Sequence, residues 1–382
     1  MNLKELSELR RRWRPEKSAV SRIYGCFVNS NKEIISDLDE ALGRMPQEEA
    51  EKYLALLKKA LSGTLGKNLI DIVFSTQQVM NSEEHRLLTA LRASELKDHD
   101  VRQAFYQKVI SSLDLGESRY LILLAHDAYD VPHRGKDGEV QPDASEEVFS
   151  YIVCSICPIK EGKLELSYFP GDNEFHCTAL QTAAAPELGF LFPAFDDRTA
   201  NIYNALFYSR KPDELHQEFI DAVFHTEPPM SAAEQKEAFQ AALSAALGEA
   251  CSVDVVQAIH EQLSTKIEEH KQNKNPELLT ISVDEICALL QDCGIAREHI
   301  SAFRDQCSEQ FGVGAVLNPV NLIDANRVQI KTAQASVTVD PEHSYLVKTK
   351  LLNGRRYIML PADDGVEFNG FAVGTSTEDS GM

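Results

Sequence analysis

The chain has 382 residues, of which 43% are hydrophobic and 25% are charged, and its formal net charge is −21. This length and this composition indicate a folded protein of two or three domains and exclude wholesale disorder. The negative charge argues against general binding to nucleic acid or to an anionic membrane, because a negative field over the whole chain repels phosphate groups.

No apolar run approaches the roughly 20 residues that a membrane-spanning helix needs, and the N-terminus lacks the apolar segment of a secretion signal. We therefore expect a cytoplasmic protein without a membrane partner, whose eight cysteines are reduced thiols. Cys154 and Cys157 form the only CxxC pair, and they lie in an apolar run typical of a strand. Residues three apart on a strand point to opposite faces, so we expect two buried thiols and neither a disulfide nor a zinc site.

The first predicted helix covers residues 3–12 and leads into a basic arm. Residues 1–22 carry seven basic and three acidic side chains, a local charge of +4 on an acidic chain. The arm either binds RNA or another polyanion, with its tryptophan stacked on a base, or packs on the protein's own acidic body. We favour the second interpretation because the opposite field is so close. The residues of the basic arm are Arg10, Arg11, Arg12, Trp13 and Arg14.

Strands and helices alternate between residues 21 and 113. Short apolar runs bounded by turn residues predict the strands, and apolar residues that repeat with a period of 3.6 predict the helices. We expect strands at 21–28, 33–36 and 69–74 and helices at 46–61, 83–96 and 99–113.

Residues 120–210 hold most of the apolar runs of strand length, together with the densest set of His and Asp. No break in composition separates this stretch from the N-terminal part. The two parts together predict one α+β body, residues 1–211, with a mostly antiparallel central sheet and flanking helices. The strand-like runs are 120–125, 148–157, 164–169 and 188–195.

The pattern becomes helical after residue 211 and strand-like after residue 327. Capping boxes at 231–234 and 282–285 mark two helix starts, and a polar run at 271–276 is typical of a linker. We expect a helical segment at 212–312, a small all-β unit at 313–374 and a disordered tail at 375–382. The predicted helices are 212–224, 232–247, 253–271, 282–292 and 296–310, and the predicted strands are 328–331, 336–339, 345–352 and 356–360.

Four motifs give the chain a family resemblance. They are Tyr53-Leu-Ala-Leu-Leu-Lys-Lys, Leu61-Ser-Gly-Thr-Leu-Gly-Lys-Asn-Leu-Ile-Asp, Ala125-His-Asp-Ala-Tyr-Asp-Val-Pro and Phe192-Pro-Ala-Phe-Asp-Asp-Arg. With these motifs the whole chain resembles the domain-of-unknown-function 4317 family, proteins of anaerobic, mostly gut-dwelling bacteria. The resemblance implies a bacterial cytosolic protein whose full length is the functional unit. It implies no activity, so it assigns no catalytic role to any residue.

One candidate site lies where the predicted strands end in polar residues. Imidazoles and carboxylates at such an edge suit a divalent ion such as Zn, Mn or Mg, and a nearby arginine suits metal-assisted hydrolysis of a phosphate ester or an amide. The candidate metal ligands are His126, Asp127, Asp130, His133 and His176. The candidate catalytic residues are His126, Asp127, Asp130, His176, Asp196, Asp197 and Arg198.

The same residues also have a purely structural interpretation. Asp130 then belongs to a turn, His126 is a satisfied core histidine, and residues 196–198 cap a helix at 198–205 or form a local ion pair. Their spacing matches no ligand motif. If the strand ends are neighbours, three carboxylates (Asp127, Asp130 and Asp196) enclose either a divalent metal or Arg198.

Two functions therefore stay open. We favour a non-catalytic binding or regulatory protein with a protein partner, because no specific motif supports catalysis. RNA is a partner only through the basic arm. The alternative is a metal-dependent hydrolase, and a divalent metal is the one cofactor that it implies. The sequence assigns no substrate, no named partner and no oligomeric state.

Overall fold

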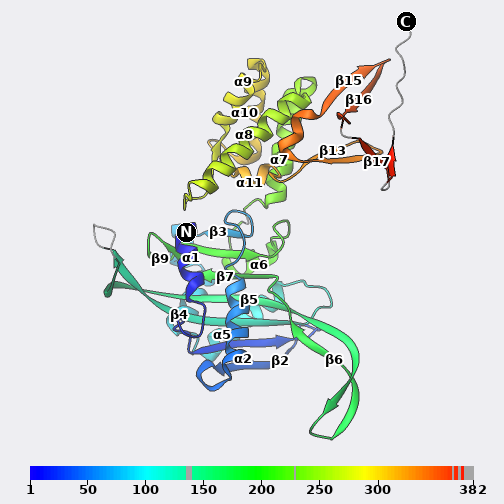
Figure 1. The fold of residues 1–382 in the computed structure, drawn as a ribbon. Helices are drawn as coiled ribbons and strands as arrows, with labels where there is room; N and C mark the ends of the chain where they lie inside the picture. Colours follow the sequence, from blue (N-terminus) through cyan, green and yellow to red (C-terminus); the bar gives the residue numbers. More distant parts are fainter. Residues whose placement is uncertain (135–139, 228, 364, 369–370, 374–382) are drawn as a thin grey trace. The chain divides into compact units, whose positions relative to one another are not determined.

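The computed structural model describes the chain except for residues 135–139, 228, 364, 369–370 and 374–382 (Figure 1). The chain forms two compact units. The first unit comprises residues 1–235 and 276–278, and the second unit comprises residues 236–275 and 279–382. Helices and antiparallel strand pairs occur in both units, so the predicted α+β class is confirmed.

The first unit is built on an eight-stranded antiparallel sheet. Its strands follow the order β2-β1-β4-β5-β7-β10-β3, and β6 pairs with the far half of β5. β4 is longer than the predicted run 120–125, because buried residues continue to alternate through Tyr129 and Val131. The strands are β1 (Arg22–Val28), β2 (Ile34–Ala41), β3 (Leu69–Val73), β4 (Tyr120–Arg134), β5 (Val140–Phe169), β6 (Glu174–Ala183), β7 (Leu188–Phe192) and β10 (Asn204–Ser209).

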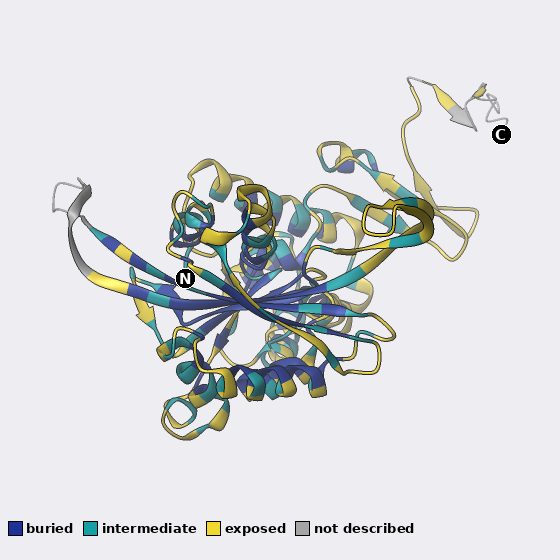
Figure 2. Cartoon of the chain, turned by 90° about the horizontal axis from the view of Figure 1, so that it is seen from below, coloured by how far each residue is buried: buried dark blue, intermediate teal, exposed yellow. Residues whose placement is uncertain are grey.

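Helices cover both faces of this sheet, and its central strands are accordingly dark blue in Figure 2. On one face, α1 and α2 share a core with Leu123 and Ala125 of β4. On the other face, α4, α5 and α6 share a core with Ile122 and Leu124. Successive residues of β4 thus serve two cores, as the side-chain period of a strand requires. The helices are α1 (Leu3–Arg12), α2 (Gln47–Lys59), α3 (Thr76–Asn81), α4 (Glu83–Ala93), α5 (His99–Ser112) and α6 (Gln217–Phe224), with a 3-10 turn η1 (Leu42–Arg44).

β5 continues past the point where its neighbours end. Beyond Pro158, which pairs with β4, the described part of β5 pairs with β6 alone. Residues 159–183 therefore form a two-stranded ribbon, here called the β5–β6 hairpin, which curves away from the rest of the sheet (Figure 1). A smaller hairpin of β8 (Ala194–Asp196) and β9 (Thr199–Asn201) follows β7 in the chain.

The second unit has a helical core followed by small hairpins. Its buried cluster includes Phe239 of α7, Leu263 of α8, Leu290 of α9 and Phe303 of α10. The described strands after residue 327 pair as separate two-stranded hairpins. The helices are α7 (Ala232–Leu247), α8 (Val253–Gln272), α9 (Val283–Asp292), α10 (Arg297–Phe311) and α11 (Pro319–Leu322), with 3-10 turns η2 (Gly248–Ala250) and η3 (Pro341–Leu346). The strands are β11 (Ile281–Ser282), β12 (Val316–Leu317), β13 (Val328–Lys331), β14 (Ser336–Val339), β15 (Lys348–Leu352), β16 (Arg355–Met359), β17 (Val366–Phe368) and β18 (Phe371–Val373).

The division of the chain differs from the predicted one. The boundary expected after residue 211 lies after residue 235, because α6 buries Phe219 and Phe224 in a core of the first unit. The helical segment and the C-terminal strands, which were expected to be separate, fall in one unit. The tail expected at 375–382 lies outside the described residues.

Candidate functional site

The N-terminal helix α1 lies on the face of the sheet that carries Asp127. Its side chains Leu6 and Leu9 are fully buried, and Trp13, directly after the helix, is 3% exposed. These three side chains belong to the same core as Tyr129 of β4. Their burial fixes the register of α1 on the sheet, where Arg12 faces Asp127 and Glu8 faces Tyr129.

Asp127 is a buried charge on this face, with 1% of its side chain exposed. Its Oδ1 accepts a hydrogen bond from the backbone NH of Ala19 at 2.9 Å, and its Oδ2 accepts one from the Tyr151 hydroxyl at 2.7 Å. Arg12 of α1 supplies the opposite charge, with its Nε 3.4 Å from Oδ2. Burial, and then the Asp127 charge, raise the pKa of Tyr151 well above its ordinary value, so the phenol keeps the proton that it donates. Both oxygens of Asp127 are therefore engaged inside the protein.

A second carboxylate, Glu8 of α1, continues this network. It accepts a hydrogen bond from the Tyr129 hydroxyl, and the Arg12 guanidinium lies 4.2 Å from the centre of the same ring. Burial, followed by the hydrogen bond to Glu8, raises the pKa of Tyr129 to about 12. Arg198 Nη1 lies 2.9 Å from the other oxygen of Glu8. Arg198, one of the two alternative cations considered for the site of Asp127, thus pairs with Glu8.

Asp197 and Arg198 form the two-residue turn between β8 and β9. Both have a positive φ, of 47° and 61°, as the central residues of a type I′ hairpin turn do. The helix start expected at 198–205 is therefore wrong. A positive φ costs conformational energy in a residue other than Gly, so this turn needs support from outside. Glu5 of α1 supplies it by accepting a hydrogen bond from the Arg198 backbone NH at 3.2 Å.

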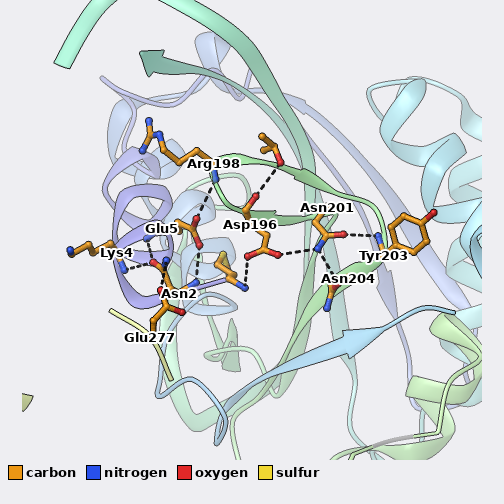
Figure 3. Close-up of polar contacts among 11 residues, drawn as sticks. Asn2, Lys4, Glu5, Asp196, Arg198, Asn201, Tyr203, Asn204 and Glu277 are labelled. Carbon is orange, nitrogen blue, oxygen red and sulfur yellow. Dashed lines mark hydrogen bonds and ion pairs between the residues drawn. The ribbon is translucent and has the colours of Figure 1, made fainter. Parts of the chain in front are cut away.

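Figure 3 shows how the first turn of α1 meets the β8–β9 hairpin. The Asn2 side chain caps the helix by accepting a hydrogen bond from the Glu5 backbone NH at 3.1 Å. Asp196 accepts a hydrogen bond from the Asn201 side chain at 3.1 Å and lies 3.4 Å from the Met1 amino group. The carboxylates drawn there have protein groups as partners, which is the pattern of a docking contact.

His126 lies on the opposite face of the sheet from Asp127, because neighbouring residues of a strand point to opposite sides. Its half-buried ring places Nε2 2.8 Å from Ser150 Oγ. Burial lowers the pKa of His126, and the carboxylates of Glu95 and Asp127 oppose that effect. Asp130 follows the alternation of β4 onto the His126 side and is exposed.

The remaining histidine candidates lie elsewhere on these strands. His176 is in the β5–β6 hairpin, where it pairs with Ser167. His126 pairs with Ile152, which precedes Ser167 by 15 residues on β5, so the two histidines lie far apart along this strand. His133 is part of β4, but its side chain lies outside the described residues.

The described residues therefore do not gather into the predicted metal site. The two sheet faces separate His126 from Asp127, and the length of β5 separates His176 from both. Arg12, and not Arg198, is the cation beside Asp127. What the geometry provides is a polar network that fastens α1 to the sheet.

The basic arm also directs most of its described contacts inward. Arg10 donates to the backbone carbonyls of residues 61 and 63, and Arg12 binds Asp127. Trp13 is buried, so its ring has no face free for a nucleic-acid base. Arg11 and Arg14 are exposed. These positions agree with the interpretation that the arm packs on the protein itself.

Cys154 and Cys157 are buried free thiols. Cys154 belongs to the core beneath α4, α5 and α6, and Cys157 belongs to the core beneath α1 and α2, so they lie on opposite faces as their spacing predicts. Burial raises the pKa of Cys157 to about 12 and raises that of Cys154 well above its ordinary value. Both are protonated at neutral pH, which disfavours nucleophilic or metal-binding chemistry.

One mixed group of ligand-type side chains does come together in the part of the chain that the structure describes. Glu187, Glu214 and His216 each place one ligand atom within 4.8 Å of the other two. None of them is among the residues that the sequence marks as candidates. The local signal is only the Glu-x-His spacing of Glu214 and His216, and Glu187 stands 27 residues before it.

The family model described as Domain of unknown function (DUF4317) matches residues 1–371. The chain therefore belongs to this family, and the resemblance seen in its motifs is confirmed over essentially the whole chain. A search of the curated proteins finds no match. Within the described residues, no helix has both the length and the apolar character that crossing a membrane requires.

Proposed function

We propose that the chain is a non-catalytic protein-binding protein of the bacterial cytoplasm, and that its partner is a second copy of itself docked on the β5–β6 hairpin. The observation that carries the proposal is an exposed apolar ladder on one face of that hairpin. The network around Asp127 supports it indirectly, because its polar groups are used to fasten α1 rather than to form a reactive site.

The apolar ladder follows from the register of β5 and β6. Directly paired residues of an antiparallel ribbon point to the same face, and every second pair returns to it. On this face Leu164 is 73% exposed, Leu166 is 70% exposed and Phe175 is 62% exposed. The three rungs of the ladder are Leu164 with Ala179, Leu166 with Cys177, and Tyr168 with Phe175.

The opposite face of the same hairpin is mostly polar. Glu165 pairs there with Thr178, and Ser167 pairs with His176. The hairpin is therefore amphipathic, like a strand pair of a larger sheet that has one face on a core. In the described residues of one chain, no such core lies against the ladder, since its large side chains stay exposed.

An isolated two-stranded ribbon is at best marginally stable in water, and its stability normally comes from further strands or from a covered apolar face. Contiguous exposed apolar surface of this kind marks an interaction site. Both outer edges of the β5–β6 hairpin also lack a strand partner beyond Pro158 among the described residues. Unpaired strand edges and an exposed apolar face are surfaces on which a strand or a sheet of another protein docks.

Electrostatics make this face the one on which a second copy can dock. Two chains of formal charge −21 repel each other over most of their surfaces. The ladder carries no charged residue, so it is a surface on which two copies can meet at low electrostatic cost. A two-fold axis through the middle rung, Leu166 with Cys177, brings the ladder of one chain against the same ladder of the other chain. Two-fold symmetry is the commonest symmetry of soluble oligomers.

The molar mass of the full chain in solution tests the proposal. Light scattering behind a sizing column should give twice the chain mass of 42.6 kDa at about 10–100 μM, the range of a standard reversible contact. Leu166→Glu places a charge in the middle of the ladder and should return the protein to the monomer. Leu180→Glu is the matched control: Leu180 is also 70% exposed but lies on the opposite face of the hairpin, so this variant should remain dimeric.

The position of Cys177 gives a second readout. It is exposed on the middle rung, so mild oxidation or a short bis-maleimide reagent should join two chains through it, and Cys177→Ser should abolish the product. A wild-type chain that stays monomeric over this concentration range, or a Leu180→Glu variant that dissociates as readily as Leu166→Glu, would refute the second copy as occupant of the ladder.

A further inference from the structure

The first unit holds a second polar cluster, which the α1 network does not reach. It lies at the edge of the sheet where β7 begins and β10 ends. We propose that Glu187, Glu214 and His216 bind a divalent transition-metal ion of the zinc type. The inference is independent of the proposed self-association, because these residues lie outside the β5–β6 hairpin.

The sheet fixes the position of Glu187. This residue directly precedes β7, its backbone NH donates to the carbonyl of Ile156 at 2.9 Å, and its own carbonyl accepts from the NH of Arg210 at 2.8 Å. Glu187 is thereby held between β5 and the end of β10, and it is 6% exposed. A ligand on this rigid framework has a defined direction, which a metal site requires.

The connection between β10 and α6 brings the other two side chains to Glu187. The Ser209 hydroxyl lies 2.8 Å from the carbonyl oxygen of Lys211 and 2.6 Å from that of Glu214, so it ties the connection back onto the strand. Leu215, between the two ligands, is buried in the core. With its middle residue anchored in this way, the connection presents Glu214 and His216 toward the same carboxylate.

The donor set has the chemistry of a zinc-type ion. Two carboxylates and one imidazole are the ligands that borderline divalent ions accept, and three protein ligands with an open position are common around zinc. Around a tetrahedral zinc at about 2.1 Å, neighbouring ligand atoms are about 3.4 Å apart. The three atoms here lie within 4.8 Å of one another, so a change of at most about 1.4 Å in any of these distances completes the site. Glu214 is exposed and can make that shift by rotating its side chain.

An independent feature of His216 points to a ligand. Its Nε2 atom is buried, yet within the described chain it has no hydrogen-bond partner. Buried polar atoms in folded proteins normally have a partner, so an unsatisfied imidazole nitrogen needs an explanation. The residue also has a φ of 50° as the N-cap of α6, where its side chain makes no capping bond. The ring is thus held beside two carboxylates without serving the helix.

Each of the two carboxylates forms an ion pair with a basic side chain, and a metal has to compete with these pairs. The Arg210 guanidinium bonds Glu187 Oε2, and Lys211 Nζ lies 2.9 Å from Glu214. The Lys211–Glu214 pair is about half exposed on both sides, so it contributes little and gives way easily. Arg210 can stay on Glu187 as the outer partner that orients a ligating carboxylate.

The test is a titration of the full-length chain, freed of metal with a chelator and kept reduced, with Zn²⁺ alone. Calorimetry should show one ion per chain with a Kd of about 1 μM or tighter, and the melting temperature should rise with added zinc. His216→Ala should weaken binding by about tenfold or more and remove the thermal shift. Lys211→Gln should strengthen binding about two- to fivefold, because it removes the competing ammonium.

His176→Ala is the matched control, since His176 is an exposed histidine 3.4 Å from Asp172 and tests for casual surface binding. Its zinc affinity should equal that of the wild type. If His216→Ala fails to fold, Glu214→Gln replaces it, because Glu214 is exposed and its change leaves the core intact. Absence of zinc binding by the wild type, or equal affinity in wild type and Glu214→Gln, would overturn the site.

Discussion

Replacing Asp127 with alanine should lower the free energy of unfolding of the first unit by about 3–7 kcal/mol, because the buried carboxylate and the contacts that it makes are lost. The contacts of Asp127 set this range. It accepts two hydrogen bonds, from Ala19 and Tyr151, and each bond to a buried charge contributes about 1.5–3 kcal/mol. The contact with Arg12, at 3.4 Å and partly exposed, adds about 1 kcal/mol or less.

Trp13 provides the assay for this variant. It is the single tryptophan of the chain, it is buried in the first unit, and its ring centre lies 6.4 Å from that of Tyr151. Its fluorescence during urea unfolding therefore reports on the first unit and not on the second. Asp130→Ala, an exposed position on the same strand, should change the free energy by about 0.5 kcal/mol or less. A loss below about 1 kcal/mol in Asp127→Ala would show that the network does not fasten α1.

Three further outcomes follow from the same contacts. Burial holds the pKa of His126 below its ordinary value, so this histidine binds a proton more readily in the unfolded chain than in the folded one. The free energy of unfolding should therefore fall as the pH drops below about 6.5. His126→Gln should weaken this pH dependence, as measured by urea unfolding midpoints at several pH values. Alkylation of the native protein followed by peptide mapping should label the exposed Cys177 quickly and the buried Cys154 and Cys157 only after unfolding. Limited proteolysis should cut early within the polar, exposed stretch 271–277, and first cleavage inside the sheet would contradict the division of the chain into units.

The sequence predicts the class of the first unit well and the ends of its strands poorly. The run Tyr120–Ala125 is continuously apolar because both faces of β4 are covered there, and such a run is easy to recognise. From His126 onward only one face stays buried, so the signal changes from a run to an alternation. The strand continues to Arg134. His126, Asp127 and Asp130, which the sequence places after a strand, are therefore inside β4. Their side chains point to two faces of the sheet and do not converge.

The partners of the polar residues could not be predicted because they are remote in sequence. Arg12 and Asp127 are 115 positions apart, and no local pattern marks them as a pair. The turn at Asp197 and Arg198 has no glycine or asparagine to announce its positive φ, since contacts with α1 hold it in place. Likewise, Glu187 reaches His216 only through the pairing of β7 with β10.

The docking of α1 has a consequence for the order in which the chain folds during synthesis. Glu8 and Arg198 are 190 residues apart, so at about 5–20 residues per second the ribosome needs about 10–40 s after Glu8 to reach the arginine that binds it. During that time Leu6, Leu9 and Trp13 have no complete surface to cover them. The docking of α1 thus waits for the β8–β9 hairpin, although α1 precedes that hairpin in the chain by most of the first unit.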